Sequence, residues 1–258
     1  MVTQAPVLVA PDTFGGELRA PVVAAAIARG LERAGVTPLP ELCPLSGGGA
    51  GTIEALVPAL GGETGDGFAL VEDGATAIVE LDGAPELTGR RLAAAAATGA
   101  AVVVLAAAGA GADADSGAAA TLLQSLGDHG GLGGAALLVL CPLRAPGALA
   151  VHLRDAHGAR IAGGAPFVLD ALGFDARMRA ARALVVGEAR LDRATLLERR
   201  VAGEAAVRAR QSGVPSHAVV GTNAIDRFDA RILDVQAILE ASTVAELEAA
   251  GEALAAYL

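Results

Sequence analysis

Aromatic residues and cysteines are both scarce in this chain. Tryptophan is absent, tyrosine occurs once and phenylalanine five times, so aromatic residues make up 2% of the sequence. A core without large rings has to be built from closely packed alanine, valine and leucine, which favours valine-rich strands and alanine-rich helices. The two cysteines, Cys43 and Cys141, each precede a proline and have apolar neighbours. We expect reduced thiols here in preference to a disulfide.

Basic residues are outnumbered by acidic ones. The 258 residues include 19 Lys and Arg against 29 Asp and Glu, which gives a formal net charge of −10. Nucleic acids and anionic membranes are bound through basic faces, so we expect neither as a partner. An anionic small-molecule substrate would need a local basic pocket. A homodimer stays open, because nothing in the sequence decides it.

Long apolar runs are also absent, although the mean hydropathy is high at +0.51. A membrane-spanning helix needs about 20 consecutive apolar residues. The nearest approach, from Leu92 to Ala112, is divided by Thr98-Gly99 into a helical half and a strand half. The N-terminus lacks the basic segment of a secretory signal peptide. We therefore expect a soluble, cytoplasmic protein.

The first 65 residues alternate between strand and helix patterns. Short apolar runs at 6–10 and 38–45 are typical of buried parallel strands. Each is followed by apolar residues at helical spacing, at 21–31 and 52–60. This order predicts a parallel sheet with right-handed crossovers, in which ligands bind beyond the carboxyl ends of the strands.

The pattern changes near residue 66 and returns near residue 166. Residues 68–81 have the alternation and turn residues of a β-hairpin, and helix and strand patterns follow it. Later, strands are predicted at 183–186 and 216–220, with a single helix at 196–210 between them. We therefore predict an α/β protein of two domains. A Rossmann- or flavodoxin-like parallel-sheet domain is formed by 1–65 and 166–258, and a smaller α/β domain is inserted at 66–165.

A glycine-rich stretch, Ser46-Gly47-Gly48-Gly49-Ala50-Gly51, joins the second strand to the helix that begins at Thr52. Glycines allow a positive φ and a close approach of the backbone to a ligand. The free amides at the start of a helix favour an anion. The stretch matches neither the Walker loop nor the GxGxxG spacing. A phosphate-binding loop and a plain strand-to-helix turn are both open at this point.

Charged side chains follow two of the predicted strands. Asp12 comes directly after the first strand and could hold a metal ion or a substrate hydroxyl, or simply cap a turn. Glu188, Arg190 and Asp192 form the densest charged group at any predicted strand end, either as a site or as a structural ion pair. The histidines have no convincing metal-site spacing, and we expect all four at the surface or in loops: 129, 152, 157 and 217.

Three motifs resemble those of the bacterial glycerate kinase family, in the same order. Ala10-Pro11-Asp12-Thr13-Phe14, followed by Gly16, Leu18 and Ala20, resembles APDSFKGSLSA. The stretch from Ser46 to Thr52 resembles ADGGEGT, and the stretch from Gly187 to Thr195 resembles GEGRLDxQT. The resemblance covers nearly the whole chain and thins between about residues 109 and 164.

The resemblance implies ATP-dependent phosphorylation of glycerate or a similar small hydroxy acid, with Mg²⁺ as the metal. The catalytic residues that it implies are Asp12, Glu188, Arg190 and Asp192, of which Asp12 and Asp192 would hold the metal. The residues that would bind substrate or phosphate are Thr13, Gly48, Gly49, Gly51, Thr52 and Gly187.

The chain departs from the family at polar positions. The lysine of the first motif is Gly15, the acids of the second are Gly47 and Ala50, and Arg199 stands where the third has a lysine. In the thinner middle part, Ser116, Gly117 and Pro142 replace polar residues, Asp113 and Asp115 are at best displaced substitutes, and two segments are shortened. These losses favour weak or absent kinase activity. The alternative is a non-catalytic binding or partner subunit that keeps the fold.

Overall fold

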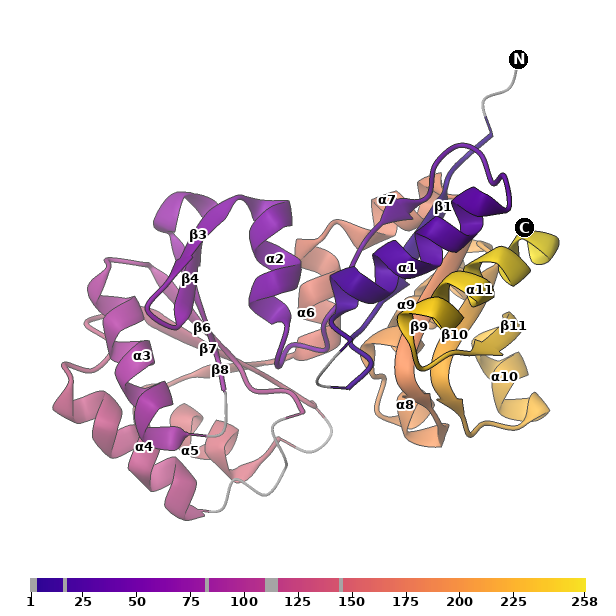
Figure 1. Ribbon diagram of the computed structural model, residues 1–258. Helices are drawn as coiled ribbons and strands as arrows, with labels where there is room; N and C mark the ends of the chain where they lie inside the picture. The colour runs from indigo at the N-terminus through magenta and orange to yellow at the C-terminus, as the bar shows by residue number, and fades with distance from the viewer. Residues whose placement is uncertain (1–3, 16–17, 82–83, 110–115, 144–145) are drawn as a thin grey trace. The chain divides into compact units, whose positions relative to one another are not determined.

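The chain folds into two compact α/β units. The computed structural model describes residues 4–15, 18–81, 84–109, 116–143 and 146–258. One unit comprises Met1–Ser46 and Leu172–Leu258, and the other Gly47–Ala171. Figure 1 shows the first unit combining the indigo start and the yellow end of the chain. The predicted α/β class with parallel sheets is confirmed.

The discontinuous unit contains a fully parallel sheet in the order β11-β10-β9-β1-β2. The predicted grouping of early and late strands in one sheet is therefore confirmed. β1 and β9 carry long runs of buried apolar residues, as expected for strands covered on both faces. The strands are β1 (Val7–Pro11), β2 (Glu41–Leu42), β9 (Ala183–Leu191), β10 (Ser216–Asn223) and β11 (Val235–Glu240).

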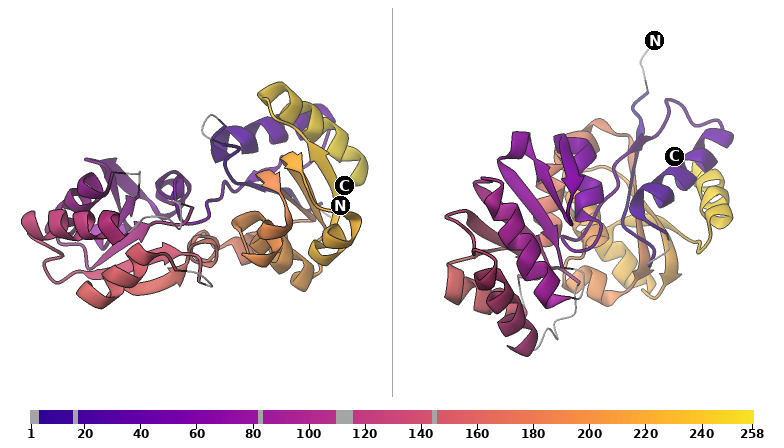
Figure 2. Two further views of the ribbon diagram at one scale, coloured as in Figure 1. Left: turned by 90° about the horizontal axis from the view of Figure 1, so that it is seen from below. Right: turned by 60° about the vertical axis from the view of Figure 1, so that its left-hand side comes forward.

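Helices cover both faces of this sheet, as the left view of Figure 2 shows. α1 and α11 pack on the face that carries Val7, Val9 and Val185, and α9 packs on the other. α1 and α11 cross closely because Gly30 of α1 lies against the backbone of α11, where a Cβ would be 2.0 Å from the Glu248 carbonyl oxygen. The helices are α1 (Ala20–Arg33), α7 (Phe174–Ala180), α8 (Arg193–Leu197), α9 (Val201–Ser212), α10 (Arg227–Leu233) and α11 (Val244–Leu254), with a 3₁₀ turn at Ala255–Tyr257.

The continuous unit contains a mixed sheet in the order β3-β4-β5-β6-β7-β8. The predicted hairpin is confirmed as the antiparallel pair β4 and β5, and β3 adds a further antiparallel strand at the edge. The other pairings are parallel. The strands are β3 (Gly62–Gly65), β4 (Phe68–Val71), β5 (Thr76–Glu80), β6 (Val102–Ala106), β7 (Ala136–Cys141) and β8 (Arg160–Gly163).

The core of the continuous unit lies mainly between this sheet and α3, α4 and α5. Alternate strand residues such as Val79, Leu105 and Val139 point into that layer. α2 and α6 pack against the sheet as well, α2 on β4 and β5, and α6 on β7 and β8. The helices are α2 (Thr52–Leu60), α3 (Pro85–Ala97), α4 (Ser116–Asp128), α5 (Ala148–His157) and α6 (Gly164–Ala171), with a 3₁₀ turn at Glu72–Gly74.

The units divide at 46/47 and 171/172, whereas the sequence patterns place the boundaries at 65/66 and 165/166. The hairpin signals begin near residue 66, but α2 already packs against β4 and β5 of the continuous unit. α6 likewise packs against β7 and β8. Both helices belong to the continuous unit because their apolar faces are buried on its sheet.

The single helix predicted at 196–210 is wrong. The structure has α8 and α9 with a break between them, where Arg199 takes a left-handed conformation with a φ of 53°. The apolar spacing continues across the break, so periodicity alone does not reveal it. Because of the break, the side chains of Arg199 and Arg200 have different partners, Glu204 and Glu188.

Two further expectations concern cysteine and membrane insertion. Cys43 and Cys141 are both buried free thiols, and burial raises the pKa of Cys43 to about 11. Among the described residues, no helix combines the length and apolar character needed to cross a membrane.

Candidate active site

Two carboxylates lie side by side where β1 and β9 end their pairing. The last paired residues are Pro11 and Gly187, and the Asp12 amide donates to the Gly187 carbonyl at 2.9 Å. Asp12 and Glu188 therefore occupy equivalent places on neighbouring parallel strands, which are about 4.8 Å apart. The carboxyl end of a parallel sheet is where α/β proteins bind ligands. Asp12 and Glu188 are thus neighbours in the sheet.

Both carboxylic acids have raised pKa values. Burial raises the pKa of Asp12 to about 6, although hydrogen bonds from the amide and hydroxyl of Thr13 lower it. Burial also raises the pKa of Glu188 to about 8, and the negative charge of Asp12 raises it further. Two acids that share a partly desolvated place cannot both ionise easily. Burial of both acids, and the charge of Asp12 next to Glu188, therefore raise their pKa values towards neutral pH.

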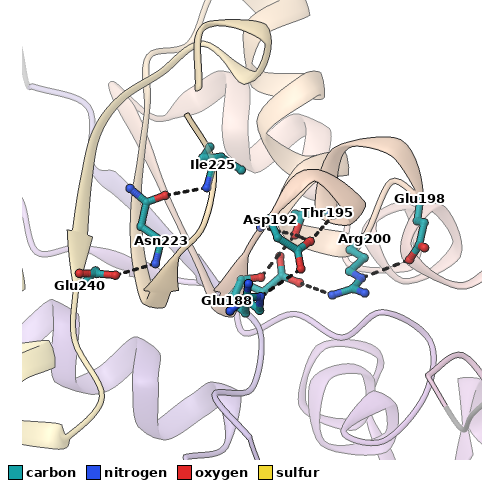
Figure 3. A network of polar contacts seen from close by, with 9 residues as sticks. Glu188, Asp192, Thr195, Glu198, Arg200, Asn223, Ile225 and Glu240 are labelled. Atoms are coloured by element: carbon teal, nitrogen blue, oxygen red, sulfur yellow. Dashed lines mark hydrogen bonds and ion pairs between the residues drawn. The ribbon is translucent and has the colours of Figure 1, made fainter. Parts of the chain in front are cut away.

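Glu188 is held in a polar network (Figure 3). Its Oε1 lies 3.9 Å from Nη1 of Arg200, whose Nε is 3.4 Å from Oε2 of Glu198. The Oε2 atom of Glu188 is buried and has no hydrogen-bond partner among the described residues. A buried polar atom without a partner is costly and commonly marks a place where a ligand, ion or water belongs.

Asp192 has a clear structural role next to this pair. Its Oδ1 accepts from the Thr195 amide at 3.1 Å, which together with the Thr195 hydroxyl forms a capping box at the start of α8. Its Oδ2 accepts from Nε of Arg190 at 3.3 Å. Burial would raise the pKa of Asp192, but the amide of Thr195 and the charge of Arg200 outweigh it and lower the pKa. Both oxygens of Asp192 are thus already engaged by the chain.

Arg199, which stands at the position of the family lysine, faces away from this group. Its Nε lies 2.6 Å from Oε2 of Glu204, a buried acid that also pairs with Arg208 at 3.1 Å. Arg200 is the side chain that faces Glu188. Sequence reasoning missed Arg200 because the direction of two adjacent side chains depends on the left-handed turn at Arg199.

Thr13 and Gly187, both predicted to bind substrate or phosphate, have local explanations. The Thr13 hydroxyl donates to Oδ1 of Asp12 at 3.1 Å, so Thr13 orients that carboxylate. A Cβ on Gly187 would lie 2.6 Å from Cβ of Pro11, so the neighbouring strand excludes a side chain there. Their contact with a ligand stays a prediction.

From Gly47 onward the glycine-rich stretch belongs to the continuous unit, and two of its glycines are packed against backbone. A Cβ on Gly48 would lie 2.4 Å from Cα of Gly164, and one on Gly49 would lie 1.7 Å from the carbonyl oxygen of Ala108. Gly51 has a φ of 84° at the start of α2. The hydroxyl of Thr52 donates to the Gly49 carbonyl at 2.7 Å. Packing therefore accounts for these residues, and their binding of phosphate stays a prediction.

The start of α2 already holds a carboxylate. The Ile53 amide donates to Oε1 of Glu80, at the end of β5, at 2.7 Å. This amide is one of those that could have faced a phosphate. Glu80 also lines a pocket of about 420 Å³ in the same unit, to which none of the predicted site residues contributes: Ile53, Thr64, Gly65, Asp66, Gly67, Phe68, Glu80 and Arg91.

The acids of the site could hold Mg²⁺ only if phosphate oxygens of a bound substrate completed its coordination. Within the described ranges, no three His, Cys, Asp or Glu side chains are grouped so that they could hold a metal ion. Mg²⁺ is commonly bound by one or two carboxylates plus phosphate oxygens and water. Asp12 could provide one such carboxylate, and the unpartnered oxygen of Glu188 is suited to the same purpose. Asp192 is less suited, because its oxygens are engaged.

Two other predictions are corrected or left open by the described structure. His217, expected at the surface, is 1% exposed on β10, because its strand is paired on both sides within the sheet. Burial lowers its pKa, and its ring lies 6.3 Å from that of Tyr257. Asp113 and Asp115 lie outside the described residues.

The edge of the sheet continues into β10 and β11 with further polar contacts (Figure 3). The backbone amide of Asn223 donates to Oε1 of Glu240 at 2.7 Å. The side-chain Oδ1 of Asn223 accepts from the backbone amide of Ile225 at 3.3 Å. These contacts hold the chain where it leaves β10.

Comparisons with known proteins agree with the three motifs. A sequence profile of the glycerate kinase family matches residues 7–84 and 143–257. The fold is similar to the crystal structure of a protein named as glycerate kinase 2 of Salmonella typhimurium LT2, with a TM-score of 0.73 and 19% identity over 99% of this chain and 98% of that chain. No curated protein matches the chain. The family profile covers well over half of the residues and includes the Asp12 and Glu188 motifs, so the chain belongs to the glycerate kinase family.

Proposed function

We propose that the protein is a phosphotransferase that uses ATP and Mg²⁺ to phosphorylate glycerate or a similar small hydroxy acid, with slow turnover. The observation that carries this proposal is the pair of adjacent carboxylic acids, Asp12 and Glu188, next to the point where β1 and β9 end their pairing. Family membership supports the kinase part of the proposal.

The pair supplies an acceptor for the proton of the substrate hydroxyl. A general base works best when its pKa lies near the working pH. The raised pKa values of Asp12 and Glu188, about 6 and about 8, meet that condition. As the hydroxyl oxygen forms its bond to the terminal phosphorus of ATP, its proton passes to the ionised carboxylate and ADP leaves. Thr13 keeps Asp12 oriented for this step.

Phosphoryl transfer also needs fixed positive charge around the phosphate oxygens. Mg²⁺ bound with ATP would supply part of that charge. The chain itself provides Arg190 and Arg200 near the pair, both about half exposed. The family's lysine in the first motif is absent, because Gly15 stands there. We expect slow turnover for this reason, since each lost electrostatic contact commonly costs about 10²-fold in rate.

The proposal is tested by incubating the purified protein with D-glycerate, ATP and Mg²⁺ and following ADP and phosphoglycerate. We expect product at a rate well below the ~1 to 100 per second that is usual for kinases. A rate within that range would contradict slow turnover and show that the lost side chains are compensated.

A non-catalytic binding subunit is the second candidate. Gly47 and Ala50 stand at the acidic positions of the glycine-rich motif, and no atom of the described residues lies within 4 Å of where a Cβ on Gly47 would be. If calorimetry detects D-glycerate or ADP binding while no phosphoglycerate forms even after long incubation, this second function is favoured over the first.

A further inference from the structure

Arg199 and Arg200 are adjacent in the chain and have different partners. Arg199 follows the break between α8 and α9 and reaches Glu204, whose side chain is only 5% exposed. Glu204 also accepts from Nε of Arg208 at 3.1 Å. The charge of Arg199 is thus committed to a buried acid inside the fold.

Arg200 is placed differently. Its amide donates to the Thr195 carbonyl at 3.2 Å, which ties its backbone to α8. Its guanidinium is 3.9 Å from Glu188 and 3.4 Å from Glu198, and its side chain is 45% exposed. A separation of 3.9 Å is an ion pair but is too long for a hydrogen bond. Among the described residues, Nη2 of Arg200 makes no hydrogen bond, so donors remain for a ligand.

We infer that Arg200 is the cation of this site that binds an oxyanion of the substrate, either the carboxylate of the hydroxy acid or a phosphate. The inference deepens the proposed function and rests on it. Ion pairs with Glu188 and Glu198 position the guanidinium of Arg200. The hydrogen bond from its backbone amide to the Thr195 carbonyl positions its backbone. A planar guanidinium with free donors can bind a carboxylate or a phosphate through two parallel hydrogen bonds.

The unpartnered oxygen of Glu188 beside Arg200 favours this role over a purely structural one. Each arginine near the pair has an acidic partner: Arg190 has Asp192, Arg193 has Asp229, and Arg200 has Glu188 and Glu198. Arg200 faces a carboxylate whose second oxygen is buried without a hydrogen-bond partner. A substrate whose hydroxyl meets Glu188 and whose oxyanion meets Arg200 would satisfy both groups at once.

The test compares Arg200→Gln and Arg200→Lys with the adjacent Arg199→Gln as the matched control. Binding of D-glycerate, inorganic phosphate and a non-hydrolysable ATP analogue with Mg²⁺ is measured by calorimetry at one constant ionic strength. Loss of a charged hydrogen bond should weaken the binding of at least one probe by roughly tenfold or more in R200Q. R200K should lose less, because lysine keeps the charge without the fork. R199Q should bind every probe within about twofold of the unaltered protein, since Arg199 faces Glu204.

The three probes also identify the anion. Weaker binding of D-glycerate alone assigns Arg200 to the substrate carboxylate, and weaker binding of phosphate and the ATP analogue assigns it to the nucleotide phosphates. Equal binding by R200Q and the unaltered protein overturns the inference, as does a loss confined to R199Q, and either result leaves the proposed function standing. Failure of the unaltered protein to bind any of the probes overturns the inference and the proposed function together. If R200Q does not fold, R200K decides, and unchanged binding by R200K to all three probes overturns the bidentate contact.

Discussion

Each unit has an acid at the end of a buried strand, and the two acids are used differently. Glu80 ends β5 of the continuous unit and accepts from the Ile53 amide at 2.7 Å. Glu188, near the end of β9 in the discontinuous unit, lies next to Asp12 and has a buried oxygen without a hydrogen-bond partner among the described residues. A satisfied acid stabilises its surroundings, whereas an unsatisfied buried acid costs stability and commonly marks a place where a ligand, ion or water belongs.

The same contrast applies to the other strand ends. In the continuous unit, β6 is followed by Ala107 and Ala108, and β7 ends at Cys141 before Pro142. In the discontinuous unit, β1 leads to Asp12 and β9 contains Glu188 and Arg190. The chemistry of the protein is therefore expected in the discontinuous unit, and the following predictions test that comparison.

The largest effect is expected on turnover. Asp12→Asn and Glu188→Gln each remove a proton acceptor while keeping the shape of the side chain. Loss of a general base commonly lowers kcat by about 10²- to 10⁴-fold, so we expect residual kinase activity to fall to background. Glu32→Gln, an exposed acid on α1, is the control and should leave the rate unchanged. An equal loss of activity in all three variants would contradict a catalytic role of Asp12 and Glu188.

The next effect concerns packing, in which the two units should behave alike. A Cβ on Gly30 would lie 2.0 Å from the Glu248 carbonyl oxygen, and one on Gly89 of α3 would lie 2.5 Å from the Leu122 carbonyl oxygen. Gly30→Ala and Gly89→Ala should each lower the free energy of unfolding by about 1–3 kcal/mol, because two helix backbones must separate. The measurement is chemical denaturation followed by circular dichroism.

Gly127 provides the control for the packing prediction. It is the next-to-last residue of α4, where a Cβ would meet no heavy atom of the described part of the chain within 4 Å. Gly127→Ala should therefore raise the free energy of unfolding by about 0.5–1 kcal/mol. Destabilisation by this variant as large as that of Gly89→Ala would show that close helix contact is not the cause.

A smaller effect is expected from the two strand-end acids as the pH changes. Burial raises the pKa of Glu188 from 4.5 to about 8, so the folded state holds this proton more tightly than the unfolded state. Stability from this group is present at low pH and is lost as the pH rises through about 8. Glu188→Gln should then stabilise the protein relative to the unaltered chain by about 1 kcal/mol or more at pH 9, and by much less at pH 5.

Glu80→Gln should act with the opposite sign. It replaces a charged acceptor at the start of α2 by a neutral one, which should cost about 0.3–1 kcal/mol. Thermal melts of both variants at pH 5 and pH 9 compare them directly. Stabilisation by Glu80→Gln at pH 9 equal to that by Glu188→Gln would contradict the distinction between a satisfied and an unsatisfied acid.

The smallest effect is expected at His217. Burial lowers its pKa, so the unfolded state binds a proton first as the pH falls below the ordinary value of 6.5. The contribution of His217 to stability is therefore present above that pH and is lost below it. His217→Phe should lack this loss, and its melting temperature should fall less between pH 7.5 and pH 5.5. His152→Gln, at an exposed histidine of the continuous unit, should behave as the unaltered protein.

Much of the fold follows from short-range patterns in the sequence. The buried runs that became β1 and β9, and the hairpin of β4 and β5, were predictable because alternation and apolar runs report which faces are buried. The placement of Asp12 and Glu188 was predictable as well, since residues that follow parallel strands lie at one edge of the sheet. The three motifs predicted the glycerate kinase family, and the match to the family profile confirms it.

Tertiary structure decided the partners of individual side chains. Arg199 and Arg200 are neighbours in the sequence, yet a left-handed turn sends one to Glu204 and the other to Glu188. α2 belongs to the continuous unit because its apolar face finds β4 and β5 there, and Glu80 then reaches its first turn. Local patterns determine which residues are buried and where strands end, because those depend on near neighbours. Which charge meets which acid depends on segments far apart in the chain, and only the folded arrangement brings them together.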